Sequence, residues 1–141
     1  QRLSRQLMEE LANPPAAVAV CAEEAPAIAA EVAAASGVAV GRTSDRLRSP
    51  ANAPRPWVRP FLAEAAGRPA AEARPVLVDL GDRIGLLRPV GVGAPCLKCH
   101  AEPERLSPGV RDALTGRYQA DAATGYAEGD FRGFFWAEAA K

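Results

Sequence analysis

The sequence predicts an α+β fold in which N-terminal helices flank a small antiparallel sheet. Apolar residues in the first quarter of the chain recur at spacings of three and four, which is typical of helices. Residues 73–80 and 83–90 are strand-like segments joined by Gly81-Asp82, the pattern of a β-hairpin. At 141 residues the chain has room for one hydrophobic core. We therefore expect a single domain over residues 1–141, with residues 1–14 as an N-terminal helical extension.

Two helical segments are expected before the first strand. Residues 2–12 place four apolar side chains on one stripe, and Asn13-Pro14-Pro15 is expected to end this helix. The stripe consists of Leu3, Leu7, Met8 and Leu11. Residues 16–35 are rich in alanine and place Cys21 on the apolar face, before Pro26, which either kinks the helix or begins another.

The remaining elements follow from turn and capping signals. The expected order is a strand at 38–43, a proline-rich loop at 44–56, a helix at 57–66, the hairpin, a helix from Pro108 to about Leu114, a loop at 117–130 and a last strand at 130–136. The segment between the hairpin and the last strand, which holds Cys96 and Cys99, therefore lies between strands, and this order supports the α+β class.

Residues 96–100 read Cys-Leu-Lys-Cys-His, the attachment motif of a c-type haem. In this interpretation Cys96 and Cys99 form thioether bonds, and His100, the only histidine, is the proximal iron ligand. Two other interpretations are a redox dithiol and a zinc site made with Cys21. The dithiol lacks the expected strand–helix context, and adjacent Cys99 and His100 are poorly placed to share one tetrahedral ion.

The residue opposite His100 is the open question, because a second histidine is absent from the sequence. The position is either empty or filled by Met8, Cys21, Lys98, Lys141 or a tyrosine. The chain has three cysteines, so the haem leaves Cys21 unpaired. From the residues alone, Cys21 is equally well explained as a small buried hydrophobe on a helix face.

Composition excludes several classes of function. The net charge is zero, so nucleic acid is not an expected partner, and no apolar run of about 18 residues predicts a membrane span. No acid–base pair, nucleophile constellation or phosphate loop suggests an enzyme. Because haem c is attached outside the bacterial cytoplasm and the chain begins with Gln1, we expect a periplasmic or otherwise extracytoplasmic piece of a longer precursor.

Four stretches of the chain resemble a family of extracytoplasmic haem-c domains with a PAS-like fold. They read VCAEEAPAIAAEV, GRTSDRLRSPANAPRPW, CLKCH and DAATGYAEGDFRGFFW, and are spread over residues 20–136. The resemblance implies one haem c with His100 as the proximal and Cys21 as the distal ligand. The family more often has Asn and Gly where this chain has Ser49 and Ala101, which leaves the ligands untouched.

Further pocket residues and the role are expectations. Arg42 and Arg48, from a basic segment at 42–59, are candidate partners of the haem propionates, and Trp57 and Tyr126 are candidate pocket aromatics. A thiolate ligand lowers the reduction potential, and its release on reduction would open a site for CO or NO. We therefore expect a redox or diatomic-gas sensor with a redox or signalling partner protein; the alternative is a low-potential electron-transfer cytochrome.

Overall fold

The computed structural model describes residues 2–141, with side chains from residue 5 onward. The helices are α1 (Arg2–Glu10), α2 (Pro14–Ala19), α3 (Ala25–Ser36), α4 (Arg59–Ala65), α5 (Leu97–His100) and α6 (Pro108–Thr115), and the strands are β1 (Ala39–Thr43), β2 (Val76–Asp79), β3 (Arg83–Gly91) and β4 (Phe131–Ala140). A π-helical turn, Val20–Glu24, joins α2 to α3. None of these described helices is long and apolar enough to cross a membrane.

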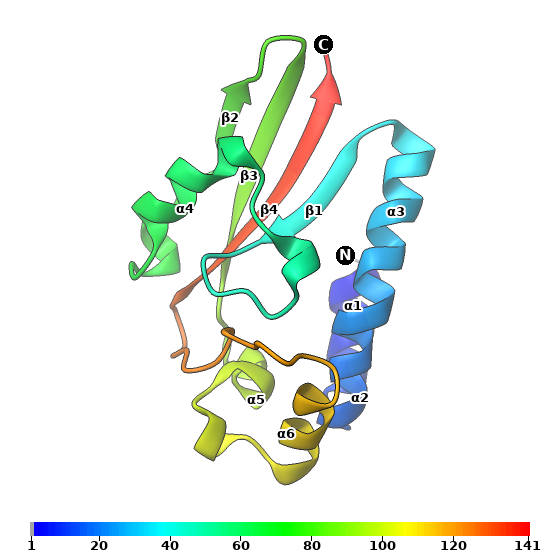
Figure 1. Ribbon diagram of the computed structural model, residues 1–141, viewed down its shortest axis with the longest axis vertical. Helices are drawn as coiled ribbons and strands as arrows, with labels where there is room; N and C mark the ends of the chain where they lie inside the picture. Colours follow the sequence, from blue (N-terminus) through cyan, green and yellow to red (C-terminus); the bar gives the residue numbers. More distant parts are fainter. Residues whose placement is uncertain (1) are drawn as a thin grey trace.

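The four strands form one antiparallel sheet in the order β1-β4-β3-β2 (Figure 1). The chain leaves the sheet after β3, builds α5 and α6 at the end far from the β2–β3 hairpin, and returns as β4 (Figure 1). The predicted α+β class is therefore confirmed, including N-terminal helices beside a small antiparallel sheet and a cysteine loop between strands.

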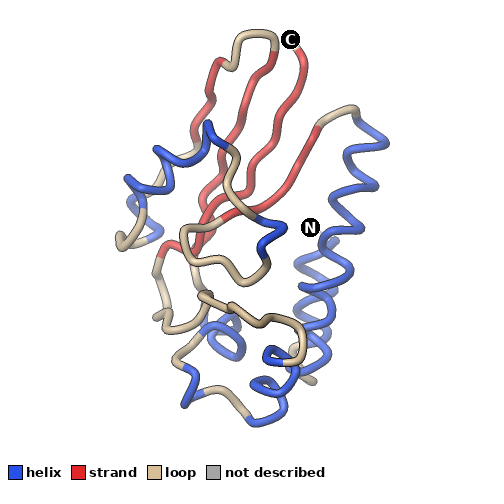
Figure 2. The backbone as a smooth tube through the Cα atoms, viewed as in Figure 1, coloured by secondary structure: helices blue, strands red, loops and turns tan. Residues whose placement is uncertain are grey.

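One face of the sheet is covered and the other is partly open. On the covered face, α4 packs over the sheet core, which consists of Val58, Leu62, Ala65, Leu87, Phe131 and Phe134. Glu138 is buried on this face and accepts hydrogen bonds from Trp57 and Arg83. On the other face α3 runs beside β1 (Figure 2), while large apolar side chains of the remaining strands stay exposed. They are Leu77, Ile84, Leu86 and Phe135.

A second cluster lies among the helices below the sheet. This helical core consists of Val18, Ala101, Leu106, Val110 and Leu114, with Cys99 and Tyr118 packed against it. Because it joins α2, α5 and α6, it brings the N-terminal helices against the Cys-Leu-Lys-Cys-His segment. The fold thus unites two sequence regions that are about 75 residues apart.

Several element boundaries differ from those expected, each for a physical reason. Pro14-Pro15 begins α2 rather than only ending the helix before it, since proline needs no amide partner in a first helical turn. Residues 16–35 are not one uniform α-helix, because a π-helical turn precedes Pro26. The last strand continues to Ala140, four residues past the expected end, because Glu138 is buried in the sheet despite its charge. The expected stripe residue Leu3 lies in α1, but its side chain is outside the described part.

Candidate functional site

The Cys-Leu-Lys-Cys-His motif forms a compact helical turn at the end of the molecule opposite the hairpin (Figure 1). Pro95 lies in the first part of this turn, and neither Cys96 nor Cys99 forms a disulfide. Leu97 packs against the helical core and also against a third cluster of Val92, Ala123 and Tyr126. The turn is therefore held from both sides, while its two thiols remain free for covalent chemistry.

The imidazole of His100 is held in one tautomer by a backbone carbonyl. Its Nδ1 lies 2.7 Å from the Ala123 oxygen, and because a carbonyl can only accept, Nδ1 carries the hydrogen. Nε2 is then unprotonated, and within the described part of the chain no hydrogen bond to it is formed. Burial, together with the charges of Arg48 and Arg132, lowers the pKa of His100 to about 3. The result is a neutral imidazole with one free nitrogen, which is the form that binds iron.

Arg48 forms hydrogen bonds to both the motif and the loop that contains Ala123. Its Nη2 donates to the Cys99 oxygen at 2.6 Å and to the Ala123 oxygen at 3.2 Å. Its Nε forms an ion pair with Asp121 at 2.9 Å, and Asp121 in turn accepts the Ala123 amide at 2.8 Å. The propionate role of Arg48 stays a prediction, but these contacts occupy Nε and Nη2 and support a structural role instead.

Two arginines that the sequence did not single out, Arg46 and Arg132, surround Tyr126. The guanidinium carbons lie 4.1 Å (Arg46) and 5.3 Å (Arg132) from the centre of the Tyr126 ring. The Tyr126 and His100 rings form a T-shaped pair, with ring centres 6.2 Å apart and an angle of 85° between their planes. Burial lowers the pKa of Arg132, the neighbouring Tyr126 hydroxyl partly opposes this, and the charges of Arg48 and Arg42 lower the pKa further. Arg132 has no carboxylate partner within the described part of the chain. The sequence signal that could have pointed to Arg132 is its place in the stretch DAATGYAEGDFRGFFW, directly before Gly133.

The hydroxyl of Tyr126 is buried close to Arg132, but the two do not form a hydrogen bond of standard geometry, so the hydroxyl lacks a partner in the described structure. An orphaned buried hydroxyl carries an energetic cost unless a further group satisfies it. Here it lies in a region of surplus positive charge, so a carboxylate of a bound group would satisfy both the hydroxyl and the arginines. Together with two free thiols and a ligand-ready imidazole, this arrangement fits a haem and its propionates.

Cys21 lies in the π-helical turn, one helical turn beyond Val18 of the helical core, and is partly buried. It is near enough to the motif to act on it electrostatically. Burial raises the pKa of Cys99, the charge of Arg48 opposes this, and the charges of Cys21 and Cys96 raise it further. Arg42, from β1, donates from Nη2 to the Cys21 carbonyl at 2.6 Å. The structure thus brings Cys21, Arg42 and the motif into one region.

Other expected residues lie elsewhere. The Trp57 side chain packs in the sheet core and donates to Glu138 at 2.7 Å, so it does not reach the motif. Met8 is 56% exposed, Lys98 donates to the Leu11 carbonyl, and Lys141 pairs with Asp79 near the hairpin. These contacts place Met8, Lys98 and Lys141 less favourably than Cys21, whereas Tyr118 and Tyr126 both lie near the motif.

The zinc alternative receives no support from the arrangement of side chains. Within the residues that the structure describes, no group of three or more His, Cys, Asp and Glu side chains is arranged to hold a metal ion. Cys21, Cys96, Cys99 and His100 therefore do not form a tetrahedral set.

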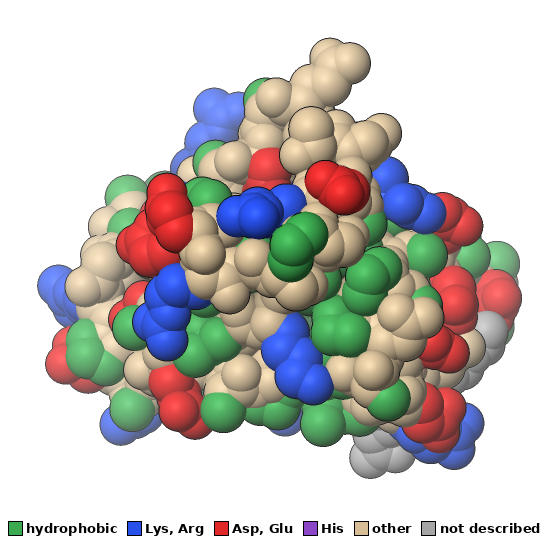
Figure 3. Space-filling model, turned by 90° about the horizontal axis from the view of Figure 1, so that it is seen from below, with side chains coloured by type: hydrophobic (Ala, Val, Ile, Leu, Met, Phe, Trp, Pro, Cys, Tyr) green, Lys and Arg blue, Asp and Glu red, His purple; other side chains and the backbone are tan. Residues whose placement is uncertain are grey.

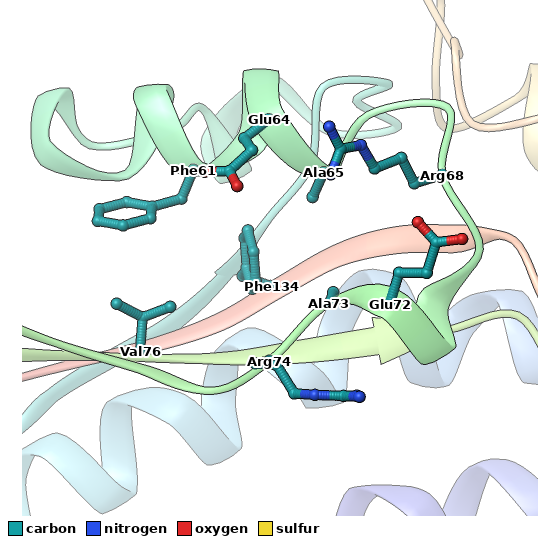
Figure 4. A pocket seen from close by; sticks show the side chains of 9 residues that line it. All are labelled: Phe61, Glu64, Ala65, Arg68, Glu72, Ala73, Arg74, Val76 and Phe134. Carbon is teal, nitrogen blue, oxygen red and sulfur yellow. The ribbon is translucent and has the colours of Figure 1, made fainter.

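Two cavities lie outside the motif. One of about 180 Å³ separates α4 from the sheet edge, with Phe61 and Phe134 among its walls (Figure 4). The other, of about 300 Å³, reaches Tyr126 and Arg46 from the side of Asp130. Seen from the end that carries α5 and α6, the surface mixes basic, acidic and hydrophobic side chains without a field of one charge (Figure 3).

A family model described as Tll0287-like matches residues 2–138. Among solved structures, the chain is similar to one described as the crystal structure of the cyanobacterial heme-protein Tll0287, with a TM-score of 0.72 and 23% sequence identity. That match covers 99% of this chain and 91% of the other, and it shows a common fold. No curated protein matches the chain.

Proposed function

The chain belongs to the Tll0287-like family, and from this premise we propose that it carries one haem c, attached through Cys96 and Cys99 and ligated by His100. The observation that carries the proposal is the hydrogen bond from His100 Nδ1 to the Ala123 carbonyl, beside two unpaired thiols. It presents Nε2 to iron and fixes the plane of the ring, which is how proteins orient a ligating histidine. The description of the similar structure as a heme-protein supports the same conclusion.

Cys21 is the proposed second axial ligand. Support comes from its place beside the motif, its electrostatic effect on Cys99 and the surface or distant positions of Met8 and Lys141. Arg132 and the Tyr126 hydroxyl are the proposed propionate partners, because both lack an anionic partner in the described structure. Arg42 is better assigned to Cys21 itself, since its Nη2 is already bonded to that residue's carbonyl.

The proposed role is that of an extracytoplasmic sensor of redox state or of a diatomic gas. Haem supplies a one-electron iron couple and, when an axial position opens, a binding site for CO or NO. Cys21 lies on a helix that continues without interruption into α3, and α3 packs on β1. Loss of a bond between Cys21 and the iron would therefore change the position of the helix that continues into α3, and α3 would pass this change to β1. A sensor needs such a structural change in response to its ligand.

The attachment is tested by producing the chain in a bacterial periplasm with the cytochrome c maturation system. We expect one haem per chain that survives denaturation, with a pyridine haemochrome spectrum of two thioether bonds. Cys96→Ser with Cys99→Ser should abolish covalent attachment. A chain that matures without haem, or holds it only non-covalently, would reject the proposal.

The alternative, a low-potential electron carrier, makes the opposite prediction about ligand change. A sensor should show low-spin ferric haem with thiolate character, which is lost in Cys21→Ala, and should bind CO once reduced. A carrier should keep both ligands in the reduced state, exclude CO and exchange electrons rapidly with small redox proteins. Spectra of wild type and Cys21→Ala in both oxidation states separate the two.

A further inference from the structure

The carbonyl of Cys21 has no amide partner within its own helix. In an α-helix it would accept from residue 25, but the Ala25 amide instead donates to the Val20 oxygen, five residues back. In that five-residue register the next amide would be that of Pro26, which has no hydrogen. The π-helical turn and the proline together therefore deprive Cys21 of a backbone donor.

Arg42 supplies the missing donor from a different element. Its Nη2 lies 2.6 Å from the Cys21 oxygen, a short charge-assisted hydrogen bond that crosses from β1 to the helix. Arg42 stands opposite Phe135 in the sheet register, so its backbone is fixed by strand pairing. Its charge also lowers the pKa of His100, behind the larger effects of burial, Arg48 and Arg132, so the guanidinium lies within reach of the proximal side of the site as well.

We propose that Arg42 is a positioning residue for Cys21, and that it holds the π-helical turn in the geometry that presents the thiol to the iron. This inference rests on the proposed function. Without the bond, the Cys21 carbonyl would be an unsatisfied acceptor at a partly buried helix, and relaxation toward an α-helical register would rotate the side chain away. π-Helical turns of this kind are typical of functional positions.

The test measures how easily an added ligand displaces Cys21. Imidazole is titrated into the ferric holoprotein, and its apparent Kd is read from the visible spectrum. Arg42→Gln should bind imidazole about tenfold more tightly than wild type, the size expected for loss of a hydrogen bond from a charged donor. Arg42→Lys keeps the charge on a shorter arm and should lie between the two.

Two matched variants separate positioning from charge. Arg111→Gln removes a positive charge from the exposed side of α6, outside the proposed haem site, and should leave the imidazole Kd within about twofold of wild type. Pro26→Ala returns an amide hydrogen at residue 26, so in that background the effect of Arg42→Gln should shrink to about threefold or less. Equal effects of Arg42→Gln and Arg111→Gln, or an undiminished effect in the Pro26→Ala background, would overturn the proposal.

A second readout does not depend on the iron. Deuterium uptake by a peptide spanning residues 18–28 should increase in Arg42→Gln and remain unchanged in Arg111→Gln, because Arg42 donates to a backbone carbonyl of this helix. Unchanged uptake in Arg42→Gln would also reject the inference. If Cys21→Ala leaves the ferric EPR spectrum unaltered, the ligand assignment itself is wrong, whereas a changed Cys21→Ala spectrum with a silent Arg42→Gln rejects the role of Arg42 alone.

Discussion

The Ala123 carbonyl accepts hydrogen bonds from both His100 and Arg48, and its own amide is held by Asp121. At the scale of single residues, this one backbone carbonyl determines which imidazole nitrogen carries the hydrogen and which is free. No side chain at position 123 is involved, since alanine contributes only backbone here. The tautomer of His100 is therefore controlled by loop conformation rather than by a second functional side chain.

Burial of a neutral His100 makes stability depend on pH. The pKa of His100 is about 3 in the fold and near 6.5 in an unfolded chain, so between these values only the unfolded chain takes up the proton. In the haem-free Cys96→Ser/Cys99→Ser protein, the free energy of unfolding should fall by about 1.4 kcal/mol for each pH unit below 6.5 and be level above about 7.5. Urea titrations measure this against the same protein with His100→Gln, and parallel curves would contradict the prediction.

Removal of Arg48 should loosen the motif without touching a ligand. Arg48→Ala leaves the Asp121 carboxylate without its ion pair and frees the Cys99 carbonyl, at a cost of about 3 kcal/mol. Urea unfolding of the holoprotein measures the loss, with exposed Arg111→Ala as the matched control. A difference between the two variants of less than about 0.5 kcal/mol would show that these Arg48 contacts are not structural.

At the scale of elements, the sequence predicted the order of helices and strands better than their ends. The hairpin was predicted because Gly81-Asp82 is a local turn signal, and α6 because Pro108 favours a first turn. The π-helical turn was not predictable from periodicity, since it depends on a hydrogen bond from Arg42 on a later strand. The extension of β4 to Ala140 likewise depends on partners of Glu138 that come from distant segments.

Glu138 should be structural and independent of the motif. Its carboxylate is buried and accepts from Trp57 and Arg83, with Arg55 at 3.1 Å. Glu138→Ala leaves these donors unpaired and should lower stability by about 2 kcal/mol, since both arginines are partly solvated. Thermal unfolding measures the loss against exposed Glu64→Ala, while the ferric spectrum should stay unchanged. A changed spectrum would mean that this face of the sheet reaches the site.

Gly133 allows β4 to lie very close to the end of β1, because it has no side chain and adopts a positive φ that other residues rarely adopt. Its φ is +144°, and an added Cβ would collide with the Thr43 carbonyl. Gly133→Ala should therefore cost more than Gly67→Ala, which has positive φ but open space around it, by at least about 1 kcal/mol. Chemical denaturation of the two variants gives the comparison, and equal losses would show that the collision is relieved without cost.

At the scale of the whole molecule, the site draws on segments far apart in sequence: the helix that carries Cys21, β1 and the loop after it, the motif, and the loop that leads into β4. Cys96, Cys99 and His100 could be proposed from sequence because haem attachment requires a fixed local spacing, and their role in attachment stays a prediction. Cys21 required the cysteine count and a family resemblance, and its role as a ligand stays a prediction. Arg132 and the Ala123 carbonyl were missed because neither a lone arginine nor a backbone oxygen has a sequence pattern that announces such a contact.

The helical core and the sheet core should differ in their dependence on haem. The helical core joins short helices around the motif, whereas the sheet core rests on long paired strands. In the Cys96→Ser/Cys99→Ser protein, deuterium uptake should increase over residues 93–126 and remain low in β3 and β4. Uniformly increased uptake would instead mean that the two cores unfold as one unit.

The His100–Ala123 hydrogen bond also bears on how the protein reaches its working state. The five motif residues are adjacent in sequence, whereas the partners that orient the imidazole lie 23 residues later and, at Arg48, about 50 residues earlier. Contacts of such wide separation form late in folding, since the intervening loops must close first. If haem c is attached as proposed, the motif is available for attachment before the rest of the fold orients the His100 ring, so final iron coordination should form later than the thioether bonds.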